Sequence, residues 1–359
     1  MTQRWADVDL AAIRRNAAYL ASLQPPGVKL IAVVKADGYG HGAIPVARAA
    51  LAAGAWGLAV STLDEAAEVR DLAGDGDRLL VLGGLVPAEA SRAVELGCAI
   101  TCSSEQLARA LADAASPERP LPVHLKVDTG MGRLGVAPEA APALARLIAG
   151  SPGLRLAGVY THFASSESDA EFTREQHRRL LSVLERLGLD PGLRHADNSA
   201  AALRYPDLAL DAVRVGIALY GCEGPDLRPA LALRGLVTHV KTLPVGATVG
   251  YGSTWRAERE TQVATVAMGY ADGVHRARAN RGDVLVRGRR AALIGRVSMD
   301  AVTLDVTGIP GVAVGDAATF IGRDGEQAIT AEEAAGWAGT ISYEVLTAIG
   351  RRVERRYSE

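Results

Sequence analysis

The sequence predicts an α/β protein with an N-terminal (β/α)8 barrel of the TIM type, residues 1–225, and a C-terminal, mostly antiparallel β domain, residues 226–359. Between about residue 9 and residue 220, strand-like and helix-like segments alternate. The strand-like segments are apolar on both faces, which is typical of a parallel sheet covered by helices. After about residue 225, short strand-like segments follow one another with glycine-rich turns between them.

About eight strand–helix units fill the first part, and this number favours a closed barrel over an open sheet. Two helix starts are well marked, because Thr62 with Glu65 and Ser103 with Gln106 have the spacing of capping boxes. The strand-like segments are VKLIAVVKA (28–36), WGLAVST (56–62), RLLVLGG (78–84), AITC (99–102), VHLKVDTG (123–130), LRLAGVYTHF (154–163), LRHADNS (193–199) and AVRVGIALYG (212–221).

The second part reads as β structure with one helix pair near its end. Its strand-like segments lie within residues 236–252, 261–273, 283–308 and 315–322, and the helix pair is predicted at 330–339 and 342–352. Near the N-terminus, WADVDL (5–10) is also strand-like, and its pattern is compatible with packing in either domain.

Composition narrows the class of protein. Of 359 residues, 48% are hydrophobic and 22% charged, which indicates a globular chain. No apolar segment approaches the roughly 18 residues of a membrane span, so no membrane association is expected. The formal net charge is -2 and no basic tract occurs, so nucleic acid is not an expected partner. The N-terminal segment lacks the regions of a signal peptide, and a cytoplasmic protein is expected.

The three cysteines indicate no disulfide framework. Cys98, Cys102 and Cys222 are an odd number at scattered spacing, which fits a reducing compartment. Cys98 and Cys102 are predicted to be small buried side chains on a strand-like segment, too far apart for a comfortable bridge.

Polar side chains follow several of the predicted barrel strands where each strand ends. The carboxyl ends of barrel strands build the active sites of such folds, so these residues should share one mouth. The set contains two lysines, two arginines, two histidines and a hydroxyl, with almost no carboxylates. We expect a cationic basin suited to an anionic ligand such as a phosphorylated cofactor. The residues are Lys35, Lys126, Arg133, His162, His195, Ser199 and Arg214.

Lys35 ends the first clear strand and is followed by glycines at 38, 40 and 42. One interpretation is an ordinary lysine whose chain extends to solvent. The other is a desolvated amine with a lowered pKa, able to attack an aldehyde, beside glycines that let the backbone approach a ligand. Position alone leaves both interpretations open.

The segment AVVKADGYGHG (32–42) resembles the pyridoxal-phosphate attachment signature of alanine racemases. Seven further segments resemble blocks of the same family, in family order and across nearly the whole chain. They are KVDTGMGRLG (126–135), YTHFASS (160–166), HADNSAA (195–201), VRVGIALYG (213–221), YGSTW (251–255), MGYADG (268–273) and GRVSMD (295–300). The resemblance implies an isomerase acting on alanine, with pyridoxal 5'-phosphate as cofactor, no metal, and a homodimer with shared active sites.

The resemblance also assigns cofactor contacts. Lys35 is similar to the lysine that holds the cofactor, and Tyr39 and Tyr343 to two phosphate-binding tyrosines. Ser199 and the backbone N–H groups of Gly216 and Ile217 resemble the rest of the phosphate cradle, although Ser199 is also read as a helix N-cap.

Arg214 resembles the arginine that faces the pyridine nitrogen, and His195 would orient it. Arginine acts only as a donor, so the nitrogen must accept and the ring withdraws less charge, which suits simple proton exchange. The alternative is an Arg214 paired with Asp211 or Asp197 on a surface.

Racemisation needs one acid/base group on each face of Cα. Lys35 serves one face, and Tyr270 resembles the opposite group, contributed by the partner subunit; the alternative is a half-buried strand aromatic. Tyrosine ionises near pH 10 and is ordinarily a poor base at neutral pH, but a cationic basin favours its anion. His162, a predicted cofactor-site residue, resembles the histidine that hydrogen-bonds this tyrosine across the interface.

The resemblance implies three further roles. Arg133 is similar to the residue that binds the phenolic oxygen of the cofactor and the substrate carboxylate. Met299 resembles the residue whose backbone N–H binds that carboxylate from the partner, with Arg296 and Tyr251 lining the entry channel. Lys126 resembles a lysine that is often carbamylated, which would make it an anion beside Arg133.

Three other readings remain open. A barrel-fold pyridoxal-phosphate decarboxylase of basic amino acids shares the two-domain plan but uses an acidic residue at the pyridine nitrogen. A racemase of broader specificity, for serine or larger side chains, has the same machinery. A pyridoxal-phosphate carrier without activity would be a single barrel without the β domain.

Overall fold

The computed structural model describes residues 2–359, and these form two compact units. The barrel unit comprises Ile13–Gly38 and Ala43–Leu227. The β unit comprises the N-terminal residues up to Ala12, Tyr39–Gly42 and Arg228–Glu359. The division therefore falls close to residue 225, but it assigns two short segments of the predicted barrel domain, one at the N-terminus and one around Tyr39, to the β unit.

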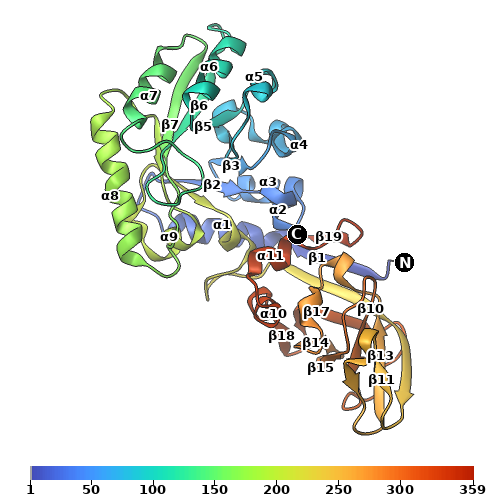
Figure 1. Ribbon diagram of the computed structural model, residues 1–359. Coiled ribbons are helices and arrows are strands. Elements are labelled where there is room, and N and C mark those ends of the chain that lie inside the picture. The colour runs from blue at the N-terminus through green and yellow to red at the C-terminus, as the bar shows by residue number, and fades with distance from the viewer. Residues whose placement is uncertain (1) are drawn as a thin grey trace. The chain divides into compact units, whose positions relative to one another are not determined.

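The barrel unit contains a closed barrel of parallel strands, which confirms the predicted fold class (Figure 1). Each strand pairs with the next in sequence, and β9 pairs with β2 to close the ring. The strands are β2 (Lys29–Val33), β3 (Gly57–Val60), β4 (Leu79–Val81), β5 (Ala99–Cys102), β6 (Leu121–Lys126), β7 (Leu154–Tyr160), β8 (Leu193–His195) and β9 (Ala212–Val215).

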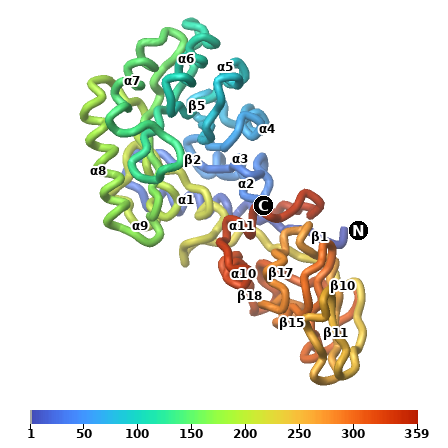
Figure 2. Tube along the Cα trace, viewed as in Figure 1, coloured from blue at the N-terminus to red at the C-terminus, as the bar shows by residue number. Residues whose placement is uncertain are grey.

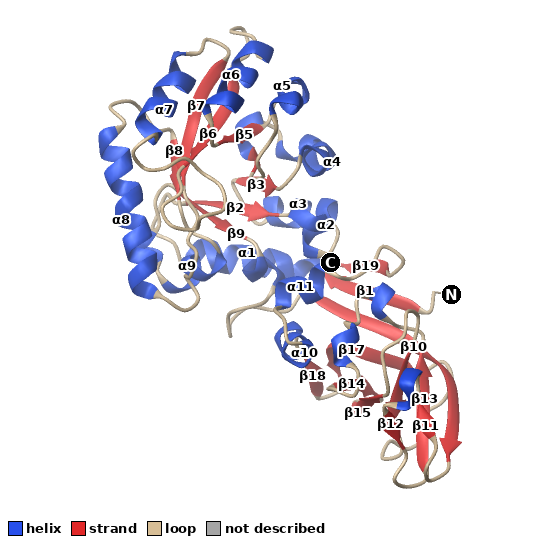
Figure 3. Ribbon diagram, viewed as in Figure 1, coloured by secondary structure: helices blue, strands red, loops and turns tan. Residues whose placement is uncertain are grey.

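Helices lie outside these strands and cover them (Figure 3). Their inward faces are rich in alanine, valine and leucine; in α3, for example, Val46, Ala47 and Ala50 are fully buried. The helices are α1 (Leu10–Ser22), which leads into the barrel, α3 (Ala43–Ala52), α4 (Leu63–Ala73), α5 (Ala90–Leu96), α6 (Glu105–Ala114), α7 (Ala141–Gly150), α8 (Ala170–Arg186) and α9 (Ser199–Arg204).

One of the two predicted capping boxes is confirmed and the other is wrong by one residue. Thr62 caps α4, with the Glu65 backbone N–H donating to the Thr62 side chain and the Glu65 side chain accepting from the Thr62 N–H. Helix α6 is capped by Ser104, which accepts from the N–H of Leu107. Ser103 and Ser104 are adjacent and both can cap a helix, and in the structure Ser104 is the cap.

The segment that begins at Lys35 is a tight left-handed turn, α2 (Lys35–Tyr39). Ala36 and Asp37 each have φ of 52°, and Tyr39 has the same value. Side chains with a Cβ disfavour this region by roughly 1–2 kcal/mol per residue. Two carboxylates hold the turn: Glu65 Oε1 accepts from the Ala36 N–H at 2.7 Å, and Asp37 Oδ1 accepts from the Ala43 N–H at 3.0 Å.

The β unit is built on one large sheet that is antiparallel apart from the β1–β19 pair. Because β17 pairs with both β14 and β10, six strands of this sheet form a hydrogen-bonded ring. The elements are β1 (Arg4–Asp9), β10 (Leu231–Leu243), β11 (Thr248–Val249), β12 (Trp255–Arg256), β13 (Thr261–Val266), β14 (Asp283–Val286), β15 (Arg289–Ile294), β16 (Val302–Asp305), β17 (Ala317–Asp324), β18 (Gln327–Ile329), α10 (Ala331–Ala338), α11 (Ser342–Thr347) and β19 (Glu354–Ser358).

The N-terminal strand belongs to this sheet. Strand β1 pairs antiparallel with β10, with Arg4 opposite Gly235, and the blue N-terminal segment runs beside the yellow β10 in Figure 2. The two possibilities for WADVDL are thereby resolved in favour of the β unit. The helix pair expected near the end of the chain is present as α10 and α11.

The structure agrees with the expectations for the cysteines and for membrane-spanning helices. All three cysteines are free and buried, and burial raises the pKa of the Cys98 and Cys102 thiols to about 11. Within residues 2–359, no helix has the length and apolar character needed to cross a lipid bilayer.

Candidate active site

The predicted site residues of the barrel unit lie at or near the carboxyl ends of its strands. Lys126 and His195 are the last residues of β6 and β8. Lys35 begins the left-handed turn two residues after β2, His162 follows β7 by two residues, and Arg214 lies within β9. In a closed parallel barrel these strand ends face one mouth.

Arg214 is the centre of this cluster, at only 3% exposure. Its Nη1 donates to His195 Nδ1 at 2.7 Å, and its Nη2 donates to the carbonyl oxygens of Thr161 and Ala196 at 3.0 and 2.9 Å. Nη2 also lies 3.2 Å from His162 Nδ1. Burial lowers the pKa of Arg214 to about 10, which leaves it charged at neutral pH.

These contacts fix the tautomers of three histidines. Because guanidinium only donates, Nδ1 of His195 must accept, and its proton lies on Nε2. That Nε2–H donates to Nδ1 of His124 at 2.9 Å, so the proton of His124 lies on its own Nε2. Nδ1 of His162 also faces a guanidinium nitrogen of Arg214, which cannot accept, so the ring hydrogen of His162 lies on Nε2. Burial, reinforced by Arg214, lowers the pKa of His162 and His195 well below the usual range, so both rings are neutral.

His124 and Tyr160 were not predicted as site residues, although they complete this cluster. The Tyr160 ring stacks on His195 at 4.6 Å between centroids, and its hydroxyl bonds to Thr101 Oγ1 at 2.7 Å. His124 lies two residues before Lys126 on the same strand. Alternate residues of a strand share a face. The spacing of His124 and Lys126 could therefore have predicted that His124 lies on the same face as Lys126.

The two predicted lysines of the mouth, Lys35 and Lys126, have lowered pKa values. Lys126 is 5% exposed, and burial, followed by the charges of Arg214 and Arg133, lowers its pKa to about 7. Burial and the charge of Arg133 also lower the pKa of Lys35, with a smaller opposing effect from Glu65. Both amines are thus more easily neutral than an ordinary lysine, and neutral amines are nucleophiles.

Ser199 and the turn after β9 form a cradle of polar groups. Ser199 Oγ accepts from the backbone N–H of Gly216 at 2.9 Å and of Ala218 at 3.3 Å. Within residues 2–359 the backbone N–H of Ile217 has no hydrogen-bond partner. Ser199 is not the cap of α9, because the Asn198 side chain accepts from the N–H of Ala201 in that role. The N-cap interpretation of Ser199 was therefore wrong.

Within residues 2–359, no carboxylate forms an ion pair with Arg214. Asp211 is held by Arg194, with Nη2 2.6 Å from Oδ1. Asp197 is fully buried, neither of its oxygens has a hydrogen-bond partner within residues 2–359, and burial raises its pKa to about 7. The alternative of a surface pair between Arg214 and either aspartate is therefore excluded.

The β unit holds the other predicted residues. Tyr270 begins a short 3-10 turn (Tyr270–Asp272) and not a strand, and it is 42% exposed. It lines a cavity of about 330 Å3 together with Met299, Arg296 and Tyr251. The backbone N–H of Tyr270 donates to the Ser298 carbonyl at 3.0 Å, which ties this turn to the Met299 segment. Tyr39 and Tyr343 also lie in this unit, with ring centroids 6.1 Å apart.

Models of known protein families match both units of the chain. The family model described as "Alanine racemase, N-terminal domain" matches residues 8–224, and "Alanine racemase, C-terminal domain" matches residues 230–357. The alanine racemase of Desulfovibrio desulfuricans is 43% identical over 367 residues, covering 99% of this chain and 98% of that protein.

The chain belongs to the alanine racemase family. Its fold matches the crystal structure of alanine racemase from E. faecalis with a TM-score of 0.93 at 36% identity, over 99% of this chain and 98% of the other. A histidine racemase from Leuconostoc mesenteroides has the same fold, with a TM-score of 0.91 at 29% identity over 99% and 98% of the two chains. As a member of this family, the protein is an isomerase.

The residues of this alanine racemase family member fit pyridoxal phosphate in three respects. Nε of Arg214 has no partner within residues 2–359, so one donor remains for a ring nitrogen. The N–H of Ile217 remains for a phosphate oxygen. Lys35 supplies an amine of lowered pKa at the end of β2.

The lowered pKa of Lys126 predicts a pH-dependent stability. The unfolded chain keeps the Lys126 proton up to about pH 10.5, whereas the folded chain releases it near pH 7. Between these values the unfolded state binds more protons, so the free energy of unfolding should rise with pH by up to about 1.4 kcal/mol per pH unit. In CO2-free buffer, urea unfolding between pH 7 and 9 should show this rise for the wild type, a smaller rise for Lys126→Met, and no change of slope for the exposed-site control Lys241→Met. Identical slopes for wild type and Lys126→Met would contradict the assignment.

Proposed function

We propose that this protein interconverts L-alanine and D-alanine, using pyridoxal 5'-phosphate, as a cytoplasmic homodimer that supplies D-alanine for peptidoglycan. Its family membership, and the relatives named alanine racemase at about 40% identity over their full length, support the substrate. The single observation that carries the proposal is the strand-end cluster of Lys35, Arg214 and Ser199 in the barrel unit, because it combines a nucleophilic amine, a donor for a ring nitrogen and a phosphate cradle.

Lys35 holds the cofactor in this proposal. Pyridoxal phosphate supplies an aldehyde that an amine captures and a ring that withdraws electrons from the substrate Cα. The lowered pKa of Lys35 keeps a fraction of its amine neutral and nucleophilic. Tyr39, Ser199 and the N–H groups of Gly216 and Ile217 hold the phosphate, with Tyr343 beside Tyr39.

Arg214 sets the reaction type. Its Nη atoms donate to His195, Thr161 and Ala196, and its Nε has no partner within residues 2–359. A guanidinium cannot accept the proton of a ring nitrogen. Arg214 would therefore donate to the ring nitrogen of a bound cofactor and leave it unprotonated, so that the ring would withdraw less charge than beside a carboxylate. This favours proton exchange at Cα over the decarboxylase reaction, whose enzymes place an acidic residue at this position.

Two groups exchange the proton in this proposal, Lys35 on one face of Cα and the partner's Tyr270 on the other. The exposed position of Tyr270 leaves it accessible to a second chain. The His162 Nε2–H would donate to the phenol oxygen across the interface.

The substrate carboxylate is held from both chains. Arg133 approaches Lys35 and Lys126 closely enough to lower the pKa of both, which places its charge at the mouth. The backbone N–H of Met299 is contributed by the partner, and Met299 is 52% exposed in the isolated chain.

Lys126 is a carbamate in this proposal. Its neutral amine attacks the carbon of CO2, an N–C bond forms as one C=O π bond of CO2 opens, and one N–H proton leaves to solvent, so a neutral amine becomes an anionic carbamate. The pKa of about 7 makes this step feasible at neutral pH. The anion would then attract Arg133, which the lysine cation would repel.

The second candidate function is that of a racemase with broader substrate specificity. The fold is shared with a histidine racemase at 29% identity, so the fold alone does not limit the side chain of the substrate.

Purified protein loaded with pyridoxal phosphate should convert L-alanine to a mixture approaching equal amounts of both enantiomers, as measured by chiral chromatography. L-Serine, L-histidine and L-lysine run in parallel should react at least about tenfold more slowly. Equal rates would establish the broader racemase, and release of CO2 would establish the decarboxylase.

Tyr270→Phe tests the two-base scheme. Removing one of two bases should slow proton removal from one enantiomer by about 100-fold or more, because acid–base catalysis contributes that much. Deuterium exchange at Cα, measured separately from L- and D-alanine, should therefore become unequal. Tyr251→Phe changes a neighbouring phenol of the same cavity and should affect both directions alike. An equal loss from both enantiomers in Tyr270→Phe would rule out the assignment.

Complementation tests the shared site. Lys35→Ala and Tyr270→Phe chains should each be nearly inactive, and Lys35→Ala should also lose the visible absorption of lysine-bound cofactor. In a heterodimer one of two sites is intact, so random mixing should restore about a quarter of the wild-type activity. Mass spectrometry of differently tagged chains checks heterodimer formation. If heterodimers form and activity stays absent, each site is built within one chain.

A further inference from the structure

Gln176 is a fully buried polar side chain of α8 that has no role in the reaction proposed above. The buried face of this helix consists of Thr173, Gln176, Leu180 and Val183, so its first half is polar and its second half apolar. A helix that connects parallel barrel strands runs back from their carboxyl ends to their amino ends. The polar half of this face therefore lies toward the mouth.

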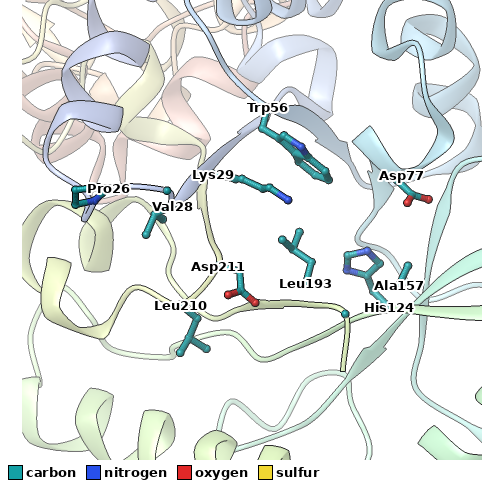
Figure 4. A pocket seen from close by; sticks show the side chains of 12 residues that line it. Pro26, Val28, Lys29, Trp56, Asp77, His124, Ala157, Leu193, Leu210 and Asp211 are labelled. Carbon is teal, nitrogen blue, oxygen red and sulfur yellow. The ribbon is translucent and has the colours of Figure 1, made fainter. Parts of the chain in front are cut away.

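The amino-terminal end of the barrel gives no reason for a polar residue on α8. A cavity of about 540 Å3 lies there, where Lys29 and Leu193 begin β2 and β8 (Figure 4). Within residues 2–359, no residue of α8 lines this cavity. The contacts of Gln176 lie instead among the loops at the mouth.

Gln176 joins the loops that follow two neighbouring strands. Its Oε1 accepts from the backbone N–H of Ala164 at 2.8 Å, and its Nε2 donates to the His162 carbonyl oxygen at 3.2 Å, both in the loop after β7. Nε2 also donates to Thr129 Oγ1 at 3.3 Å, in the loop after β6. One amide group thus ties the backbone of His162 to the loop that carries Arg133.

Thr129 continues this link toward Arg214. The Thr161 hydroxyl donates to the Val127 carbonyl at 2.9 Å, so it accepts from the Thr129 hydroxyl at 2.8 Å. The Thr129 hydroxyl in turn accepts from Gln176. The Thr161 carbonyl accepts from Arg214 Nη2 at 3.0 Å. The contacts of Gln176 and of Arg214 therefore belong to one buried network.

Two neighbours of Gln176 on α8 hold the same loop. Arg179 Nη1 donates to the Thr129 carbonyl oxygen at 2.9 Å. A Cβ on Gly130 would lie 2.8 Å from Phe172 Cζ, so the loop packs closely against this ring. Phe172, Gln176 and Arg179 are four and three residues apart and share a face of the helix. Gln176 is the residue of this face that also binds the loop after β7.

We propose that Gln176 is a positioning residue, which holds the loop of His162 against the loop of Arg133 at the mouth. Its effect on the reaction passes through these two side chains, so the proposal rests on the function proposed above. A buried apolar residue would fill the same space, as Leu180 does one turn further along, but it would leave the two loops unconnected.

Gln176→Met tests this role, because it keeps the length of the side chain and removes all three hydrogen bonds. Leu180→Ala is the matched control: Leu180 is equally buried on the same face, and its loss disturbs packing without removing a hydrogen bond to either loop. Both variants should have a lower thermal unfolding midpoint. They are therefore compared, loaded with cofactor, at a temperature where both remain folded.

Nitrogen NMR of isotope-labelled histidine rings measures the position of His162 independently of activity. Burial lowers the pKa of His162 most strongly, and four cations add to this effect; they are Arg214, Lys126, Arg133 and Lys35. Movement of the ring toward water and away from these charges can only raise the pKa. The pKa of His162 should therefore rise in Gln176→Met and stay low in Leu180→Ala, with the resonance assigned by its absence from His162→Gln.

Kinetics test whether this position matters for the reaction. A displacement of about 1 Å at a site can slow a reaction about 100-fold, so Gln176→Met should lower kcat/KM for L-alanine by about that factor and Leu180→Ala by less than about threefold. Gln176→Glu keeps the acceptor for Ala164 and, while protonated, one donor. It should exceed Gln176→Met in activity at about pH 6 and lose this advantage toward about pH 9 as its carboxyl ionises.

The outcomes separate this proposal from the proposed function. An unchanged pKa of His162 in Gln176→Met, or an equal rise in Leu180→Ala, would overturn the positioning role. A kcat/KM of Gln176→Met within about threefold of the control would overturn it as well. If the pKa of His162 rises in Gln176→Met alone and the wild type does not racemise alanine, Gln176 still positions His162 and it is the proposed function that fails.

Discussion

The barrel unit depends on one buried guanidinium that has only neutral acceptors. Arg214 donates to a histidine nitrogen and two carbonyl oxygens, and no carboxylate within residues 2–359 is bonded to it. A buried cation without a counter-ion is expensive unless every donor finds an acceptor. Both Nη atoms find acceptors, through the tautomers of His162 and His195 and two carbonyl oxygens, whereas Nε has no acceptor within residues 2–359.

The uncompensated charge of Arg214 also determines the chemistry of its neighbours. It is among the causes that lower the pKa of Lys126 and of both neighbouring histidines, and Arg133 acts in the same sense on Lys35. Burial is the larger cause of the lowered pKa of Lys126, and a carboxylate next to Arg214 would remove the part that Arg214 contributes. The absence of such a pair thus serves two requirements of the proposed reaction, a nucleophilic amine and a ring nitrogen that is not protonated.

Sequence reasoning was most successful where the pattern is local. Two-sided apolar strands predicted the barrel, and polar residues at their ends predicted which side chains share a mouth. It failed where neighbouring residues compete or where the determinant is distant. Ser104 and not Ser103 caps α6, and Asn198 and not Ser199 caps α9, because adjacent residues of similar capping ability differ only in tertiary fit. The turn after Lys35 is left-handed because Glu65, distant in sequence, accepts from its backbone.

The features least favourable to an isolated chain coincide with the residues that the proposed reaction needs. The strained turn carries Lys35, donors without a partner within residues 2–359 belong to Arg214 and Ile217, and the exposed side chains of the β unit include Tyr270 and Met299. Local rules of folding are broken mainly where function requires it. In the proposed reaction, a cofactor would supply acceptors for the donors at the mouth and a second chain would cover Tyr270.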